Sequence, residues 1–479
     1  MKKITQILLG HVSLLSNVIL LLLCFLFSHN LSYGQTFDAH WWNGQGYLLD
    51  FRTDPPTVTC GLASDGAFEA TGTWSDQNTG DLVFYVDDGT VRDDAGVLYT
   101  NGSGLNSNGT RTQMATVLPV PGTNAQRMYV LHSDGRDEDR DGTVYYSVVD
   151  IPSKTVLDKN IVLKSNNTEA IFGTNNGGLC GAWIGSIAKN TAGCVTDCPG
   201  SLNIWQIDGD NPLMPSRGDN PDLVVPLPVN LARSGERGSI RFSQQNDRIA
   251  LVLEGGSSTI DGGVWYADWD EDNASIGAWT KVPISAVLDT QTGYSVEFSP
   301  DGSRLFFGHQ INSTFDGQFT GWNAALYVHE IGDNFSTALT GDFVSGVQLG
   351  PDNNLYLSIA GNSTLFYMDN PNDVSSTVPA NFQSITFPGG CAVQGFNFSQ
   401  QIVFFDVCLT DTDSDGIIDE SDNCPLIANA GQEDSDMDGI GDVCDDDNDN
   451  DGVPNATDVC PGFDDSADND SDLVPDRCD

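Results

Sequence analysis

The sequence predicts an all-β fold: a β-propeller of about seven blades, followed by a C-terminal array of loops with little regular secondary structure. Three observations lead to this prediction. Residues 36–406 contain short β-branched and aromatic runs bounded by turn residues, and no convincing helix. One hairpin pattern recurs there at a period of 50–56 residues. From Asp411 to the C-terminus an acidic motif repeats four times.

The recurring hairpin joins two hydrophobic strands through a short polar turn. Its clearest copy runs from Phe298 through Pro-Asp-Gly302 to Leu305, and related copies start at Trp74, Phe242 and Leu349. The starting positions Phe242, Phe298 and Leu349 are 56 and 51 residues apart. A fixed period made only of β-hairpins is typical of a propeller, and 371 residues divided by about 53 gives seven blades. Two β-sandwiches with coincidental turns are the alternative.

Four copies of Asp-x-Asp-x-Asp form the C-terminal array, and a glycine follows the third aspartate in all but the last copy, which has Leu473. Ca²⁺ takes six to eight oxygens, alternate aspartates can wrap three carboxylates round one ion, and glycine permits the sharp turn. We therefore predict Ca²⁺ as cofactor. The predicted ligands are the alternate acids, the carbonyl after the turn and the later polar residues of each copy: Asp411, Asp413, Asp415, Ile417, Asp419 and Asp422; Asp434, Asp436, Asp438, Ile440, Asp442 and Asp445; Asp447, Asp449, Asp451, Val453, Asn455 and Asp458; Asp468, Asp470, Asp472 and Asp476.

An acidic, disordered tail is the alternative for this segment, since residues 411–479 carry 24 acidic residues and one basic residue. A disordered tail, however, needs neither a glycine after three alternate acids nor a cysteine near the end of each copy. EF-hands share the motif but need flanking helices. Starts that are 23, 13 and 21 residues apart leave no room for helix pairs.

Copies of two kinds alternate in this array. The longer kind ends in Asp-Asn-Cys-Pro or Asp-Val-Cys-Pro, and the shorter kind ends in a cysteine followed by Asp. This alternation resembles the thrombospondin type 3 repeat. The resemblance covers residues 411–479. It implies a fold with almost no hydrophobic core, wound round calcium ions and stapled by disulfides. On that pattern Cys424 pairs with Cys444, and Cys460 with Cys478. The resemblance also suggests cell adhesion.

Residues 1–34 are predicted to be a secretory signal peptide, with Lys2 and Lys3 before an apolar core, Val18–Phe27. A membrane helix is the alternative, but ten apolar residues are too few to span a bilayer. We expect a secreted or cell-surface protein with no membrane insertion in the mature chain. Ten mature cysteines favour disulfides in such a chain. The pairing of the remaining six stays open: Cys60, Cys180, Cys194, Cys198, Cys391 and Cys408.

Residues 36–406 resemble the β-propeller-like N-terminal region of secreted and surface proteins from gliding Bacteroidetes bacteria. The segments that carry the resemblance are Gly80–Val91, Leu98–Gly102, Tyr294–Gly302, Val347–Asp352 and Met368–Asn372. The resemblance implies type IX export and a cell-surface or released location.

No catalytic motif stands out, because G-x-S-x-G, H-E-x-x-H and phosphate-binding glycine loops are absent from the sequence. We therefore expect no enzyme, and a net charge of −47 argues against nucleic acid as a partner. The predicted function is calcium-dependent adhesion or recognition of an extracellular protein or glycan through the propeller. A propeller hydrolase or a lectin is the alternative. Two acidic loops of the body, Asp137–Gly142 and Asp268–Asn273, are weaker calcium candidates.

Overall fold

The chain forms two compact units, residues 1–405 and residues 406–479. The computed structural model describes residues 39–401 and 422–479, apart from 44–45, 65–70, 77–78, 107–114, 124, 135–141, 176–180, 191–197, 209–211, 214–219, 232–237, 254–262, 285–294, 316–317, 340–345, 359–363, 375–380, 389–399, 437, 464, 466–468 and 470–473. The predicted signal peptide therefore lies outside the described residues. Within them, no helix has the length and apolar character needed to cross a membrane.

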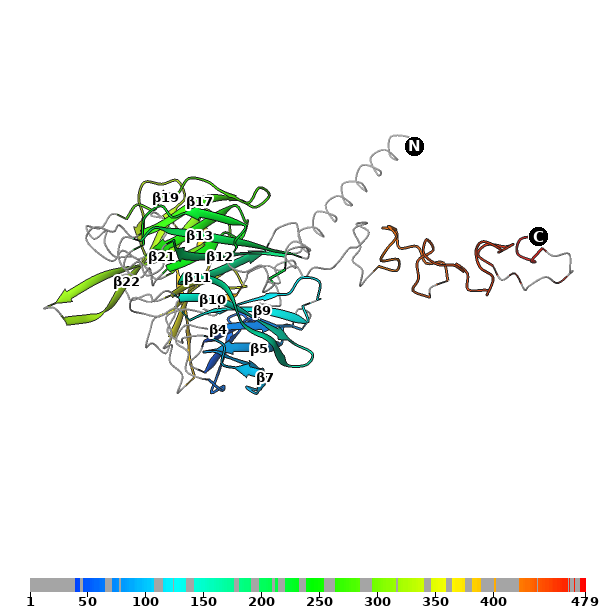
Figure 1. The fold of residues 1–479 in the computed structure, drawn as a ribbon, viewed down its shortest axis with the longest axis horizontal. Coiled ribbons are helices and arrows are strands. Elements are labelled where there is room, and N and C mark those ends of the chain that lie inside the picture. Colours follow the sequence, from blue (N-terminus) through cyan, green and yellow to red (C-terminus); the bar gives the residue numbers. More distant parts are fainter. Residues whose placement is uncertain are drawn as a thin grey trace, which may run out of the picture. The chain divides into compact units, whose positions relative to one another are not determined.

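Unit 1 is a β-propeller (Figure 1). Its described strands form five hydrogen-bonded sheets, which we divide in chain order into seven blades. The largest sheet has twelve strands and covers the second, third and fourth blades, because β11 pairs with β7 as well as with β10 and β12. The first blade contains β1 (His40–Asn43), β2 (Tyr47–Asp50) and β3 (Thr57–Cys60). The second contains β4 (Thr71–Ser75), β5 (Leu82–Asp87), β6 (Thr90–Asp93) and β7 (Leu98–Ser103). The third contains β8 (Ala115–Pro119), β9 (Arg127–Ser133), β10 (Gly142–Asp150) and the start of β11 (Thr155–Asn175).

The other four blades continue in chain order. The fourth contains the end of β11, β12 (Gly181–Lys189), β13 (Gly200–Asp208) and β14 (Leu223–Pro226). The fifth contains β15 (Gly238–Phe242), β16 (Arg248–Leu253), β17 (Gly263–Asp270), β18 (Ser275–Ile276) and β19 (Thr280–Lys281). The sixth contains β20 (Val296–Phe298), β21 (Arg304–Phe315), β22 (Gln318–Glu330) and β23 (Thr337–Ala338). The seventh contains β24 (Gly346–Leu349), β25 (Leu355–Ser358), β26 (Thr364–Met368) and β27 (Phe382–Thr386).

Three further features of unit 1 lie outside this simple succession of blades. A 3-10 turn, η2, covers Pro371–Asp373. A final short strand, β28 (Gln400–Gln401), pairs with β8 in parallel. β11 passes from one blade to the next, because its first part pairs with β10 and its last part pairs with β12. The all-β propeller prediction is therefore confirmed in unit 1.

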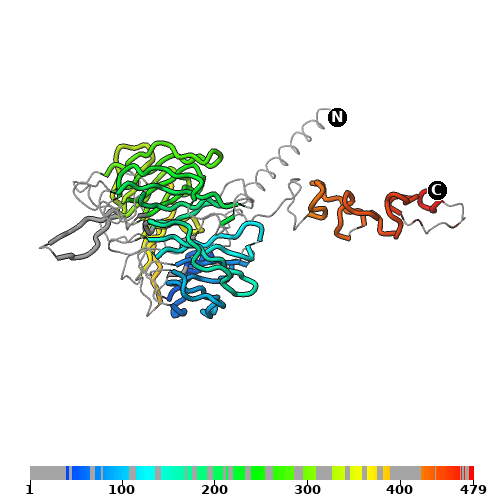
Figure 2. Tube along the Cα trace, viewed as in Figure 1, coloured from blue at the N-terminus to red at the C-terminus, as the bar shows by residue number. Residues whose placement is uncertain are grey.

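Hydrophobic clusters between consecutive blades hold the ring together. Phe172 and Trp183 of the fourth blade pack with Phe242 of the fifth, for example. The ring closes where the seventh blade meets the first. There Trp41 contacts Tyr356, with ring centroids 5.5 Å apart, and Leu49 belongs to the same cluster. In Figure 2 the yellow tube of the seventh blade runs beside the blue tube of the first. Burial between stacked sheets thus supplies the stability of unit 1.

The repeated hairpins predicted from the sequence are the first two strands of their blades. In three of them the fifth position of the pattern, Asn246, Gly302 and Asn353, has a φ of 53°, 69° and 62°. Glycine and asparagine are the residues that adopt this left-handed conformation at least cost. The turns between β15 and β16, β20 and β21, and β24 and β25 therefore share one geometry, which explains why they share a sequence pattern.

Unit 2 differs from unit 1 in having no helix or strand among its described residues. Within that part of the chain the buried apolar side chains are those of Cys424, Cys460 and Pro475, while larger apolar side chains such as Leu426 are exposed. Two disulfides cross-link it: Cys424–Cys444, with 5.7 Å between the Cα atoms, and Cys460–Cys478, with 5.6 Å. These are the two pairs that the resemblance implied, and an array without a core and stapled by disulfides is the fold predicted for this segment.

Candidate calcium-binding loops

Two clusters of three aspartates lie in unit 2, one in loop 2 (residues 434–445) and one in loop 3 (residues 447–458). In loop 2, Asp434, Asp436 and Asp438 each offer one carboxylate oxygen, and these oxygens lie within 4.8 Å of one another. In loop 3, Asp447, Asp449 and Asp451 do the same. In the second and third copies, which the structure describes, the alternating spacing therefore does bring the three acids together.

The glycine of each loop makes the turn that the sequence predicts. Gly439 has a φ of 95° and donates its amide to Asp434 Oδ2 at 3.1 Å. Gly452 has a φ of 90° and donates its amide to Asp447 Oδ2 at 3.0 Å. Each turn thereby folds the chain back onto the first aspartate of its own loop.

Replacing Gly439 by valine is expected to weaken calcium binding at loop 2 about five- to thirtyfold, because a left-handed φ costs a β-branched residue roughly 1–2 kcal/mol. No atom lies within 4 Å of an added Cβ there, so backbone strain alone causes the loss. Gly439→Asn is the matched control, since asparagine tolerates this conformation. Calorimetric titration with Ca²⁺ measures both, and equal affinities for the two variants would contradict this role of Gly439.

A hydrogen bond from the second to the ninth residue closes each described loop. Ser435 N donates to Asp442 Oδ1 at 2.8 Å, and Asn448 N donates to Asn455 Oδ1 at 3.0 Å. The fourth copy has the same bond, from Asn469 N to Asp476 Oδ1 at 2.9 Å. These ninth residues therefore position the loop backbone, and their predicted coordination of calcium stays a prediction.

Backbone amides also orient the aspartates at the third and fifth positions of the loops. Asp438 N donates to Asp436 Oδ1 at 2.9 Å, and Ile440 N donates to Asp438 Oδ1 at 2.8 Å. In loop 3, Val453 N donates to Asp451 Oδ1 at 2.7 Å. Each of these carboxylates is thus fixed through one oxygen. Asp436 Oδ2 is left for another ligand, whereas Asp438 Oδ2 accepts Asn450 Nδ2 and Asp451 Oδ2 accepts the Asp465 amide.

Several carboxylate oxygens of the array are buried without a hydrogen-bond partner among the described residues. Asp436 Oδ2, Asp447 Oδ1 and Asp449 Oδ2 have no hydrogen-bond partner in the described structure, and neither has Asp422 Oδ2 at the end of the first copy. A buried, unpaired acceptor on an ionised group is costly, so such groups normally bind a donor or a metal ion. Carboxylate oxygens are the ligands that Ca²⁺ prefers. The described residues of loops 2 and 3 therefore fit a calcium ion.

Crowded negative charge has a second measurable effect. Burial, followed by the neighbouring charges of Asp438 and Asp445, raises the pKa of Asp436. Burial, followed by the charges of Asp465, Asp449 and Asp451, raises the pKa of Asp458. The charge of Asp445 thus acts on the loop 2 cluster, and the charges of the loop 3 cluster act on Asp458. Coordination of calcium by these two residues stays a prediction.

Asp465 is a contributor to loop 3 that the sequence reasoning missed. Its amide donates to Asp451 Oδ2 at 2.7 Å, and its carboxylate accepts the amides of Cys460 at 2.9 Å and Val459 at 3.1 Å. It lies outside the alternating motif, in the stretch after Cys460-Pro461, so the motif carries no signal for it. Loops 2 and 3 are also linked directly, since Asn450 Nδ2 donates to Asp438 Oδ2 at 3.2 Å.

Other predicted residues fall beyond what the structure describes. These are Asp411, Asp413, Asp415, Ile417 and Asp419 of the first copy and Asp468, Asp470 and Asp472 of the fourth. The body loop Asp137–Gly142 is outside it too, apart from Gly142. In the other body loop, Asp270 accepts hydrogen bonds from Asn273 N and Nδ2, and the three acids do not form a cluster like those of loops 2 and 3.

Cysteines of unit 1 behave as expected of an oxidising compartment. Cys60 and Cys198 are disulfide-bonded, and so are all four described cysteines of unit 2. The partners of Cys60 and Cys198 stay open.

Unit 1 also contains a serine, histidine and aspartate in contact. His40 Nδ1 lies 3.1 Å from Ser75 Oγ, and His40 Nε2 lies 3.6 Å from Asp50 Oδ2. Ser75 is 0% exposed and His40 is 3% exposed, and burial lowers the pKa of His40. A nucleophile must reach its substrate, so this set fits a structural link between the first and second blades.

Comparison with known proteins identifies one family and a set of distant folds. Residues 406–432 and 433–463 match the model of the thrombospondin type 3 repeat. No curated protein matches the chain. Among solved structures, the extracellular domain of a hybrid two-component system from B. thetaiotaomicron is 10% identical, with a TM-score of 0.39, over 70% of this chain and 36% of that one. A polysaccharide lyase is 13% identical, with a TM-score of 0.38, over 74% and 81%. The propeller domain of a protease from Pyrococcus furiosus is 8% identical, with a TM-score of 0.27, over 59% and 72%.

The chain spans about a third of the length of the two structures that head this comparison. Likenesses at these TM-scores carry no argument about function. The match to the thrombospondin type 3 repeat does bear on function, because it falls on the loops whose aspartates cluster and whose cysteines pair. Repeats of this family bind calcium in general. Residues 406–463 of this chain are thrombospondin type 3 repeats.

Proposed function

We propose that this protein is a secreted or cell-surface calcium-binding protein, in which calcium folds the type 3 array and the propeller recognises an extracellular partner. The observation that carries the proposal is the pair of three-aspartate clusters in loops 2 and 3, with buried oxygens that lack a partner. The molecule is a non-enzymatic adhesion or recognition protein in this proposal.

Charge explains why the array needs the metal. Residues 411–479 carry 24 acidic residues against one basic residue, about half of the net charge of −47 of the whole chain. Without counter-ions such a segment repels itself and extends. Calcium cancels the repulsion within each loop and supplies folding free energy that the missing hydrophobic core does not. The disulfides then limit how far the unfolded array can spread.

Three features support an extracellular site of action. The N-terminal residues have the pattern of a signal peptide. The described cysteines are disulfide-bonded, which is typical of proteins outside the reducing cytosol. Extracellular modules bind calcium weakly, in the range set by millimolar free Ca²⁺. In this proposal the array is a calcium-stiffened stalk for the propeller.

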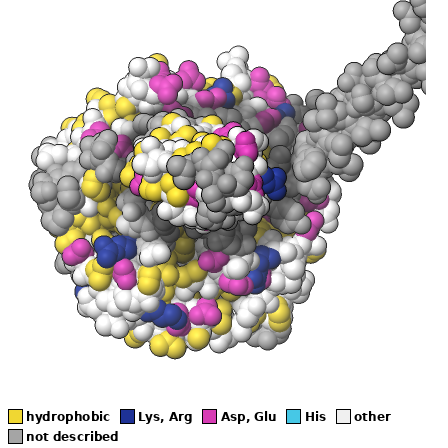
Figure 3. All heavy atoms as spheres, turned by 90° about the vertical axis from the view of Figure 1, so that its right-hand side faces the viewer, with side chains coloured by type: hydrophobic (Ala, Val, Ile, Leu, Met, Phe, Trp, Pro, Cys, Tyr) yellow, Lys and Arg dark blue, Asp and Glu magenta, His cyan; other side chains and the backbone are white. Residues whose placement is uncertain are grey.

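Surface charge limits the choice of partner. On the face drawn in Figure 3, acidic side chains lie beside lysine and arginine side chains, and no continuous basic surface is visible. The acidic chain as a whole would be repelled by nucleic acid and by anionic membranes. An extracellular protein or a glycan is therefore the proposed partner.

A hydrolase is the second candidate, because His40 lies between Ser75 and Asp50. The buried hydroxyl of Ser75 speaks against it. Hydrolysis assays of the secreted protein on peptides and polysaccharides separate the two candidates. Turnover that Ser75→Ala abolishes would establish the enzyme, while binding without turnover supports the recognition protein.

The double variant Asp436→Asn/Asp449→Asn tests the calcium proposal. Affinity depends on the number of charged ligands, so binding at loops 2 and 3 is expected to weaken about tenfold or more per site. The matched control Glu433→Gln/Asp446→Asn removes the same charge from exposed acids outside both clusters. Calorimetric titration with Ca²⁺ is the measurement. Equal titrations for the two double variants would mean that bulk charge, and not the clusters, binds the ion.

A further inference from the structure

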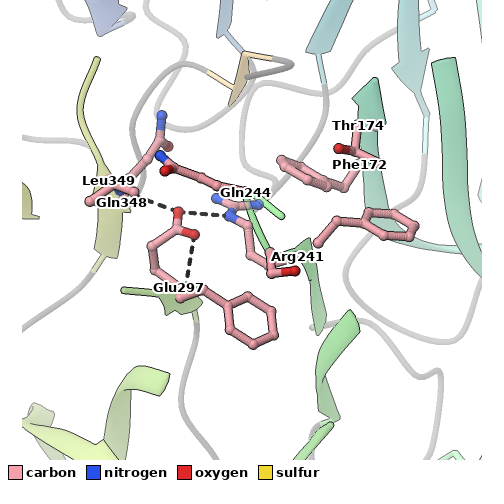
Figure 4. A pocket seen from close by; sticks show the side chains of 11 residues that line it. Phe172, Thr174, Arg241, Gln244, Glu297, Gln348 and Leu349 are labelled. Carbon is pink, nitrogen blue, oxygen red and sulfur yellow. Dashed lines mark hydrogen bonds and ion pairs between the residues drawn. The ribbon is translucent and has the colours of Figure 1, made fainter. Parts of the chain in front are cut away.

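A small pocket opens where the first strands of four consecutive blades converge. It is lined by the end of β11, by β15 and the turn after it, by β20 and by β24, and its cavity volume is about 20 Å³. Phe172, Arg241, Gln244, Glu297 and Gln348 are among the residues around it (Figure 4). Neither the calcium loops nor the Ser75–His40–Asp50 set belongs to this site.

Arg241 is the central donor of the pocket, although it is only 3% exposed. Its Nε donates to Glu297 Oε2 at 3.1 Å, and its Nη1 donates to the Ile240 carbonyl at 3.1 Å. Its Cζ lies 4.5 Å from the centroid of the Phe172 ring. A guanidinium has five N–H donors, and among the described residues these two bonds are the ones that Arg241 donates, so Nη2 and one Nη1 hydrogen remain for a ligand. Figure 4 shows the guanidinium held between Glu297 and Phe172 at the pocket.

Glu297 neutralises the guanidinium and is itself fully engaged. Its Oε2 also accepts the Leu349 amide at 3.2 Å, and its Oε1 accepts the Phe298 amide at 3.0 Å. The pair therefore adds no net charge to the pocket. An anionic ligand would leave one buried negative charge uncompensated, which is costly at low dielectric. The rest of the chain is acidic as well, so the spare N–H donors favour a neutral oxygen acceptor.

The size of the pocket narrows the ligand further. A cavity of about 20 Å³ holds roughly one water molecule, or one hydroxyl group in its place. Gln244 and Gln348 place carboxamides beside the donor, and Phe172 and Phe298 add apolar walls. A site with a few fixed polar groups and an apolar wall suits the hydroxyl and the C–H face of a sugar.

We infer that this pocket is the glycan-recognition point of the propeller, and that it accepts a hydroxyl-bearing group of a neutral sugar onto Arg241. The inference rests on the proposed recognition function and specifies its ligand. Because the donor sits on the inner strands of the ring, the site is rigid before the ligand arrives, which lowers the cost of binding.

Binding of neutral oligosaccharides to the secreted protein tests the inference. The probes are gluco-, galacto-, manno-, xylo- and arabino-oligosaccharides, together with glucuronate- and galacturonate-containing ones. Ligand-observed NMR detects binding and calorimetry measures affinity. At least one neutral probe is expected to bind, and more tightly than its uronate counterpart. No binding by any neutral probe, or preference for the uronate, would overturn the inference.

Three variants assign the binding to the pocket. Arg241→Met/Glu297→Leu removes the ion pair as a unit, which leaves no unpaired buried charge, and is expected to weaken sugar binding at least about tenfold. Thermal unfolding of this variant shows that the propeller is folded. Gln244→Leu is expected to weaken it severalfold. Gln245→Leu alters the exposed neighbour outside the pocket and should change nothing. Sugar affinity that is unchanged in both pocket variants places the binding elsewhere and refutes the assignment.

Calcium separates this inference from the proposed function. The pocket lies within unit 1, so sugar binding is expected to persist when a chelator removes calcium from the array. A protein that binds sugar but shows no calcium binding in the titration would refute the calcium proposal alone. Normal calcium titration without any sugar binding would refute the pocket inference alone.

Discussion

Chelation of calcium is expected to remove hydrogen-exchange protection from the type 3 array while leaving the propeller protected. Loops 2 and 3 have neither helices nor strands among their described residues, and Ile440, Val443 and Val459 are exposed. Little apolar burial is available to hold them. A ligand at a hundredfold excess over its Kd contributes about 2.7 kcal/mol to the state that binds it. Removing that contribution corresponds to a roughly hundredfold loss of protection.

The amides of Gly439 and Gly452 are the best reporters of this transition. They donate to Asp434 and Asp447, and so depend on the loop geometry that the ion would stabilise. Amides of β16, which is paired on both sides, serve as the internal control in the same sample. Equal protection of Gly439 and Gly452 with and without chelator would contradict the proposed role of calcium. The disulfides must stay oxidised in both samples, since their loss would also unfold the array.

Arg241→Met is expected to destabilise the propeller by about 3–5 kcal/mol, because it leaves Glu297 buried without its ion-pair partner. Glu297 is 7% exposed and links the inner strands of three blades through Arg241 and Leu349. Burial raises the pKa of Glu297 already in the intact protein, and loss of Arg241 raises it further. Thermal and denaturant unfolding of unit 1 measure the change.

The pH dependence of this variant has a definite sign. With a folded-state pKa above the unfolded value, Glu297 takes up its proton preferentially in the folded state as the pH falls. Arg241→Met should therefore regain stability as the pH falls from the folded-state pKa toward the unfolded-state pKa, and lose it as the pH rises over the same range. The intact protein should show less of this recovery.

Two controls decide whether the pair is responsible. Arg241→Met/Glu297→Leu removes both charges and is expected to restore much of the lost stability. Arg127→Met breaks an exposed pair with Asp150, 3.0 Å apart, and is expected to cost less than about 1 kcal/mol. A loss for Arg241→Met as small as that for Arg127→Met would show that Glu297 is solvated or neutral in the folded protein.

Local patterns explain what the sequence could predict. The hairpins starting at Phe242, Phe298 and Leu349 share a left-handed turn residue and so share a visible motif. The alternate aspartates of loops 2 and 3 cluster because all the ligands of a loop come from one short stretch of chain. In both cases the interacting residues are neighbours in sequence, and spacing alone places them.

Contacts between distant residues left no such pattern. Arg241 of the fifth blade bonds to Glu297 of the sixth, and His40 contacts Ser75, which lies 35 residues away in the sequence. β11 serves two blades as one strand, which blurs the period near the fourth blade where the hairpin motif is faint. Asp465 joins loop 3 from outside the repeated motif. Such pairings depend on how blades stack and how loops meet, and single-residue patterns do not encode them.

Anomalous diffraction from crystals of the mature protein grown in Ca²⁺ tests the central claim most directly. The account predicts one calcium ion in loop 2 and one in loop 3, each about 2.3–2.6 Å from oxygens of the clustered aspartates. Ordered loops that contain no ion at millimolar Ca²⁺ would contradict it.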